Sequence, residues 1–160
     1  MELNDPIKPL AIILLVFGLV SISGCIGNNK STEKLKISDF SYASSINGPN
    51  DYESHASEYG PNDQILMYFE VYGVHQNDGT AQIKQDLIVT GPQGETVLNK
   101  TIVNSAVDIP KDGTLRLKNV VTPPEDGFQE GTYQVKIKLK DKTAQKNIIF
   151  TDSFQISEAS

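Results

Sequence analysis

The chain has 160 residues, a formal net charge of −6 at pH 7 and a 38% share of hydrophobic residues. This length suits one domain, and the apolar share is high enough for a modest core, which argues against a disordered chain. An acidic chain gains nothing from counterion release on a polyphosphate, so we expect no nucleic-acid partner. The one cysteine permits neither an intramolecular disulfide nor a Cys-rich metal site, and no motif indicates a cofactor.

The N-terminus carries an apolar run, LAIILLVFGLV, that begins at residue 10 and is followed by small residues up to Cys25. The run has the length of a signal-peptide core and is short for a spanning helix, which needs roughly 20 apolar residues. Ile22-Ser23-Gly24-Cys25 resembles the lipobox of prokaryotic lipoproteins, and CIGNNK after it resembles the tether of methanogen-type archaeal lipoproteins. The resemblance implies cleavage before Cys25, a lipid on its thiol, and a place on the extracytoplasmic face of the cell membrane.

These features divide the chain into a signal peptide over 1–24, a lipidated tether over 25–33 and a folded domain over 34–160. The opening MELNDPIKP has one lysine against two acids, although signal peptides usually begin with a clearer positive bias. An uncleaved membrane helix over 7–24 is therefore the alternative. Under either interpretation the membrane is a partner, and the domain lies outside it.

Short runs of alternating hydrophobicity, separated by Gly, Pro, Asn and Asp, fill the rest of the chain and predict an all-β domain. In 132–140, apolar residues from Tyr133 to Leu139 alternate with Gln134 and three lysines, which predicts one buried and one solvated face. Both parities are apolar in 64–74, which predicts a central strand covered on both sides. The seven predicted strands are 35–43, 64–74, 83–90, 96–103, 114–121, 132–140 and 147–156.

Two strands contain irregularities. The apolar positions of 35–43 change parity between Ile37 and Phe40, which predicts either a β-bulge or a strand that passes from one sheet to the other. In 147–156, Asp152 interrupts a row of apolar residues of one parity, and we expect a bulge there as well.

The number and spacing of the strands resemble those of immunoglobulin-like and fibronectin-III-like accessory domains. Glu130-Gly131-Thr132-Tyr133 precedes the sixth strand, where such domains often have a tyrosine corner, a phenol bonded to upstream backbone. Val135 stands where a second disulfide cysteine would follow, so the Cys-Trp-Cys hallmark is absent and other sandwich topologies stay open. The resemblance implies a non-catalytic module that binds a protein or a surface polymer.

The longest stretch without a strand pattern is 44–63. It contains the candidate ligand residues Asp51, Tyr52, Glu53, His55, Glu58 and Tyr59. Clustered carboxylates and an imidazole can bind a cation, and tyrosine rings can contact a sugar or a peptide. Their spacing matches no known metal loop, so a solvated acidic loop is the plainer interpretation. A small-ligand site and an inhibitory loop for extracellular proteases are the two functional alternatives.

Other motifs carry less chemistry. Asn29 and Asn99 begin N-glycosylation sequons, which arise frequently by chance. Lys136, Lys138 and Lys140 form a basic row that either meets an anionic polymer or membrane, or simply discourages aggregation between sheets. There is no nucleophile elbow and no phosphate-binding loop, so we expect no enzymatic activity.

Overall fold

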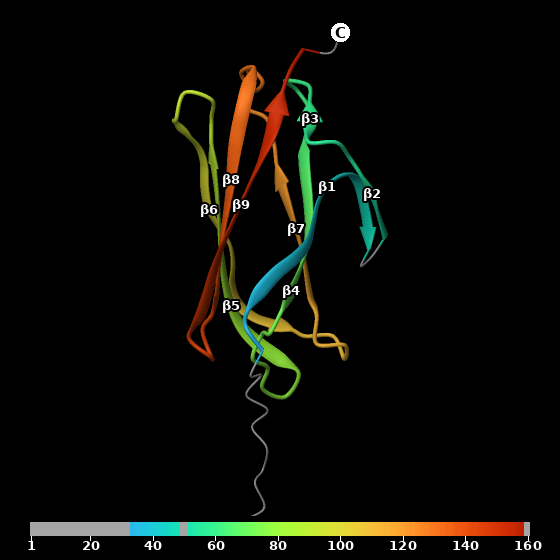
Figure 1. The fold of residues 1–160 in the computed structure, drawn as a ribbon, viewed down its shortest axis with the longest axis vertical. Coiled ribbons are helices and arrows are strands. Elements are labelled where there is room, and N and C mark those ends of the chain that lie inside the picture. Colours follow the sequence, from blue (N-terminus) through green and yellow to red (C-terminus); the bar gives the residue numbers. More distant parts are fainter. Residues whose placement is uncertain (1–32, 49–50, 159–160) are drawn as a thin grey trace, which may run out of the picture.

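The computed structural model describes residues 33–48 and 51–158 (Figure 1). This part of the chain contains β-strands and no helix, and the strands form two sheets packed face to face. It therefore contains no helix long and apolar enough to cross a membrane. The predicted signal segment 1–24, the lipobox with Cys25, and Asn29 lie outside the described residues.

The smaller sheet has four strands in the order β2-β1-β4-β7, and the larger sheet has five in the order β3-β9-β8-β5-β6. The strands of the smaller sheet are β2 (Asp51–Ser54), β1 (Lys36–Gly48), β4 (Ile65–Tyr72) and β7 (Leu115–Val121). Those of the larger sheet are β3 (Glu58–Tyr59), β9 (Lys146–Ile156), β8 (Gly131–Asp141), β5 (Thr80–Thr90) and β6 (Thr96–Asp108). Neighbours are antiparallel except β3 and β9, which are parallel.

The predicted all-β sandwich is confirmed, and each of the seven predicted strands corresponds to one long strand of the structure. The order of the strands settles the topology that the sequence left open. In an immunoglobulin constant-type domain the fourth strand lies beside the fifth. Here the fourth long strand, β6, pairs with β5 instead, so it belongs to the larger sheet.

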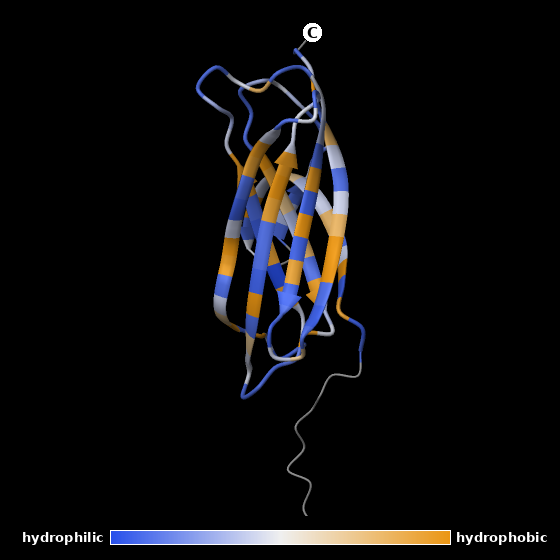
Figure 2. Ribbon diagram, turned by 90° about the vertical axis from the view of Figure 1, so that its left-hand side faces the viewer, coloured by the Kyte–Doolittle hydropathy of each residue, from blue (hydrophilic) through white to orange (hydrophobic). Residues whose placement is uncertain are grey.

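Alternation along the strands builds the core between the sheets. In β8 the apolar residues from Tyr133 to Leu139 are buried and the residues between them are exposed. Figure 2 shows the same alternation as blue and orange bands along the strands. The core cluster draws its residues from Leu35 to Ile156, and we therefore expect residues 34–160 to fold without the segment before them.

The expected tyrosine corner is present at the start of β8. The Tyr133 hydroxyl donates a hydrogen bond of 3.0 Å to the carbonyl oxygen of Gln129. The ring stacks on Phe154 with 5.1 Å between centroids and meets Phe128 edge to face. Burial raises the pKa of the Tyr133 phenol, so the neutral, donating form is favoured in the fold.

One of the two expected bulges occurs. The register of β1 against β4 shifts between Ser38 and Ser41, and Asp39 within it has a positive φ of 51°. The bulge expected at Asp152 was wrong, because β8 and β9 pair there without a break. Asp152 has the same parity as the inward-facing residues of β9 but is exposed. β3 pairs only with Gln155 and Ile156, so the edge of β9 beside Asp152 has no neighbouring strand.

The prediction that 44–63 lacks strands was also wrong. β1 continues to Gly48, and β2 and β3 both lie in this stretch. Their side chains give no apolar alternation, because β2 is mostly exposed on both faces and β3 has two residues. These strands form through backbone pairing at sheet edges, which a hydrophobic pattern does not record.

Candidate functional site

A projecting hairpin shapes the outer face of the smaller sheet. β1 pairs with β4 as far as Ala43, opposite Leu66, and then continues to Gly48 paired only with β2. We call residues 44–48 and 51–54 the arm. The arm stands out from the sandwich beside β4 (Figure 1). The Tyr52 ring of the arm stacks on Tyr68 of β4, with 4.5 Å between centroids and 24° between planes.

The middle of the outward face of β4 is buried, in line with the prediction of a central strand covered on both sides, and the flanking Leu66 and Tyr72 are half-buried. Tyr68 is 3% exposed and Glu70 is 6% exposed, although both alternate with the core residues. A carboxylate buried on the outside of a sheet needs partners that satisfy its charge. The Tyr68 hydroxyl donates to Glu70 at 3.1 Å, and the Tyr72 hydroxyl donates to its other oxygen.

Arg116 of β7 completes this network. Its Nε lies 3.0 Å from a Glu70 oxygen, and its Nη2 lies 2.8 Å from Asp112. The hydrogen bond from Tyr72 and those from Tyr68 and Arg116 hold the pKa of the Glu70 carboxyl below its usual range, although burial opposes the shift. The network fixes the Arg116 guanidinium on the outer face of the sheet.

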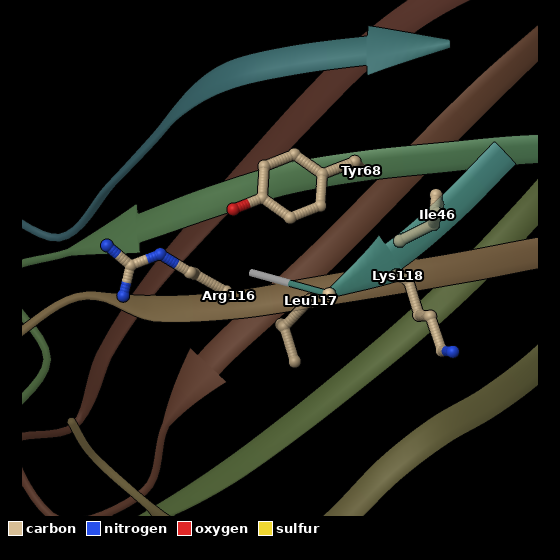
Figure 3. Close-up of a pocket in the computed structure, with 6 residues that line it drawn as sticks. Ile46, Tyr68, Arg116, Leu117 and Lys118 are labelled. Carbon is tan, nitrogen blue, oxygen red and sulfur yellow. The ribbon is translucent and has the colours of Figure 1, made fainter. Parts of the chain in front are cut away.

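A pocket of about 210 Å³ lies between the arm and this face (Figure 3). Its lining consists of Ile46, Gly48, Tyr68, Arg116, Leu117 and Lys118. Figure 3 shows Arg116 at one end of the pocket and Lys118 with Ile46 at the other, with the Tyr68 ring between the two ends. We call this pocket, together with Tyr52, the arm groove. It offers an apolar centre between two cationic side chains.

The candidate residues of 44–63 are spread over two regions. Tyr52 belongs to the arm groove, and the exposed Glu53 accepts a hydrogen bond from Ser44 within the arm. Asp51 is exposed at the start of β2.

The other three candidate residues lie near the end of β9. Tyr59 is buried, and His55 stacks on it at 4.7 Å. Glu58 accepts a hydrogen bond of 3.0 Å from Ser157. The six residues therefore do not converge on one point.

The two histidines are separated by the length of the domain. His55 stacks on Tyr59, whose strand pairs with the end of β9, whereas the backbone N–H of His75 bonds to Asp141 beside the start of β9. Within residues 33–48 and 51–158, no three His, Cys, Asp or Glu side chains are grouped closely enough to hold a metal ion.

Two further sequence features lie on the larger sheet. Asn99 is exposed on the edge strand β6, where its sequon is accessible. The row of Lys136, Lys138 and Lys140 is exposed on the outward face of β8.

Sequence reasoning missed the arm groove, because Tyr68, Glu70 and Arg116 meet only through pairing of β4 with β7. The available signal was Glu70 within an otherwise apolar strand, together with the sole arginine of the chain, Arg116. A carboxylate in such a strand calls for a cationic partner.

No protein-family model and no curated protein matches the sequence. The structure resembles part of the alkylpurine DNA glycosylase AlkC of Pseudomonas fluorescens, with 9% identity, a TM-score of 0.49, and coverage of 79% of this chain and 31% of that one. A family 123 glycoside hydrolase of Clostridium perfringens is 11% identical, with a TM-score of 0.48 and coverage of 64% of this chain and 22% of that one. The sporulation control protein Spo0M of Bacillus subtilis is 15% identical, with a TM-score of 0.45 and coverage of 80% of this chain and 51% of that one. This chain thus spans about half or less of each, and we base no functional argument on these similarities.

Proposed function

We propose that this chain is a non-catalytic lipoprotein whose β-sandwich binds a partner protein in the arm groove. A lipid on Cys25 tethers it to the extracytoplasmic face of the cell membrane. The binding role rests on the pocket between the arm and β4. The outer face of a sheet in a free-standing sandwich is ordinarily flat and open to solvent, whereas here the arm turns part of that face into a concave site. The lipobox motif supports the address.

The chemistry of the groove supports a protein segment with an apolar residue next to an acidic one. Ile46 and the Tyr68 ring give the pocket its apolar surface, and its volume of about 210 Å³ suits one large side chain. Lys118 has no ion-pair partner within the described part of the chain. A carboxylate on the partner would pair with Lys118 while the adjacent apolar side chain fills the pocket, and aromatic and arginine residues are frequent anchors of such contacts.

The proposal is tested by selecting peptides from a displayed random library with immobilised residues 34–160. We expect enriched peptides that place a Leu, Phe or Trp next to an Asp or Glu. The double variant Ile46→Asp and Lys118→Glu should lose them. The matched control, Ile149→Asp with Lys136→Glu on the opposite sheet, makes the same changes outside the groove and should retain them. A selection without enrichment, or one unaffected by the groove variant, would contradict the proposal.

A further inference from the structure

The outward surface of the larger sheet concentrates lysines. Lys136, Lys138 and Lys140 lie in one row on β8, with successive side chains about 7 Å apart along the strand. Lys84 of β5 lies directly opposite Lys140, and Ile149 of β9 lies directly opposite Lys138. We call these five residues the basic face. Figure 2 views the sandwich from this side.

The charges of the basic face are poorly compensated. Asp86 pairs with Lys84 at 2.9 Å and lies directly opposite Lys138, so it is one carboxylate among four lysines. None of the three lysines of β8 has a carboxylate within 4.0 Å in the described part of the chain. Lys84 and Lys140, directly opposite each other, repel and cost stability. The chain as a whole has a net charge of −6, so a face that concentrates lysines means that positive and negative charges are unevenly distributed over the surface. Such a face is complementary to an anionic surface.

Ile149, the apolar residue of the basic face, indicates which kind of anionic surface the face would bind. Ile149 is 62% exposed, although it is a large hydrophobic side chain in the middle of a regular strand. A soluble anionic polymer would leave this side chain in water. A lipid surface would accept it among the upper parts of the acyl chains while the neighbouring ammonium groups meet the headgroup phosphates.

The position of the tether brings this face to a membrane. Lys146 Nζ donates a hydrogen bond of 2.6 Å to the carbonyl oxygen of Glu33, so the start of the domain lies against the β8–β9 turn. Lys146 is opposite Asp141, the residue after Lys140. The basic row therefore begins where the tether enters. Residues 25–33 span at most about 30 Å when extended, which keeps a domain anchored at Cys25 close to the headgroups.

We infer that the basic face docks on the anionic lipid headgroups of the membrane, with Ile149 inserted among them, so that the sandwich lies on its larger sheet and turns the arm groove outward. The orientation draws on the proposed tether. The affinity of the face for lipid does not, so a test without the lipid on Cys25 separates the two.

The experiment measures binding of residues 34–160 to vesicles of phosphatidylcholine alone and of phosphatidylcholine mixed with phosphatidylglycerol. We expect binding to the anionic vesicles only, weakened by raising the salt from 0.05 to about 0.5 M. Each lysine near a charged membrane surface contributes about fivefold in affinity, so Lys136→Gln with Lys140→Gln should weaken binding about 25-fold. Ile149→Thr should weaken it further. The control pair, Lys36→Gln with Lys111→Gln, removes the same charge from exposed positions outside the basic face and should bind as the native chain does.

Three results would overturn the inference. One is the absence of anionic-vesicle binding, and another is equal loss of affinity in the test and control pairs. The third is binding to soluble polyglutamate as tight as binding to vesicles and insensitive to Ile149→Thr, which would assign the face to an acidic polymer. The two proposals can fail separately. If the chain isolated from cells carries no lipid on Cys25 but residues 34–160 still bind anionic vesicles, the proposed tether is contradicted and the membrane affinity of the basic face is not.

Discussion

The Tyr133 hydroxyl donates its hydrogen bond to the carbonyl oxygen of Gln129, four residues upstream, and so joins the start of β8 to the loop before it. Tyr42 is a useful contrast, because its hydroxyl is buried without a partner in the described structure. Both rings lie in the same aromatic cluster around Phe154. The two residues differ mainly in whether the hydroxyl is satisfied.

We therefore expect Tyr133→Phe to lower the free energy of unfolding by about 1 kcal/mol, the value of a typical hydrogen bond, or more if the Gln129 carbonyl is left unsatisfied. Tyr42→Phe removes an unsatisfied hydroxyl and should be neutral or stabilising. Urea unfolding of residues 34–160 measures both. Equal destabilisation by the two substitutions would show that the tyrosine corner contributes no specific bond.

Glu70 should make stability depend on pH in the acidic range. Its pKa is lowered in the fold, chiefly by the hydrogen bond from Tyr72, so its contribution is complete above the unfolded pKa of about 4.3. The contribution is lost as the pH falls below that value through the lower folded pKa. We expect Glu70→Gln to lower the free energy of unfolding by roughly 1 to 3 kcal/mol at pH 7, since Arg116 loses a charged partner, and by much less at pH 2.

Thermal or urea unfolding of the native chain and Glu70→Gln at pH 7, 4 and 2 tests this dependence. Glu53→Gln, on the exposed arm, is the control and should follow the native chain at every pH. A difference between native chain and Glu70→Gln that stays constant from pH 7 to pH 2 would mean that the charge of Glu70 is not what stabilises the network.

Asp141 should be the most sensitive carboxylate at the tether end of the domain. It is fully buried and accepts hydrogen bonds from the backbone N–H groups of His75, Thr143 and Ala144. It therefore joins the β4–β5 loop to the β8–β9 turn. Asp141→Ala should lower the free energy of unfolding by roughly 2 to 3 kcal/mol, because it leaves three backbone donors unsatisfied. The exposed Asp126→Ala is the control, and a comparable loss there would contradict the role of Asp141.

The parts of the fold that the sequence predicted correctly are those governed by side-chain alternation. The face of β8 from Tyr133 to Leu139 is buried as its pattern indicates. The pattern does not account for polar residues at inward positions. Gln85, between Ile83 and Leu87, is fully buried because its amide donates a hydrogen bond of 2.8 Å to Asn119 of the opposite sheet. That partner lies 34 residues away, and local periodicity cannot identify it.

The candidate site was predictable only in part. Tyr52 was singled out within 44–63, and the structure includes it in the arm groove. Its partner Tyr68 and the ion pair between Glu70 and Arg116 depend on the register of β4 against β7 and on the path of the arm after Ala43. Both are properties of strand pairing. His55, Glu58 and Tyr59 were grouped with Tyr52 by their proximity in sequence, but β3 places Glu58 and Tyr59 in the other sheet, and the His55 ring stacks on Tyr59.

The membrane address is the claim on which the account depends most. It is tested by intact mass and membrane partitioning of the native chain beside a Cys25→Ala variant. We predict a mature native chain that begins at Cys25, carries added lipid mass and partitions with membranes, whereas the variant shows neither the cleavage nor the added mass. A native chain that retains residues 1–24 without lipid, and that partitions as the variant does, would contradict the lipoprotein assignment.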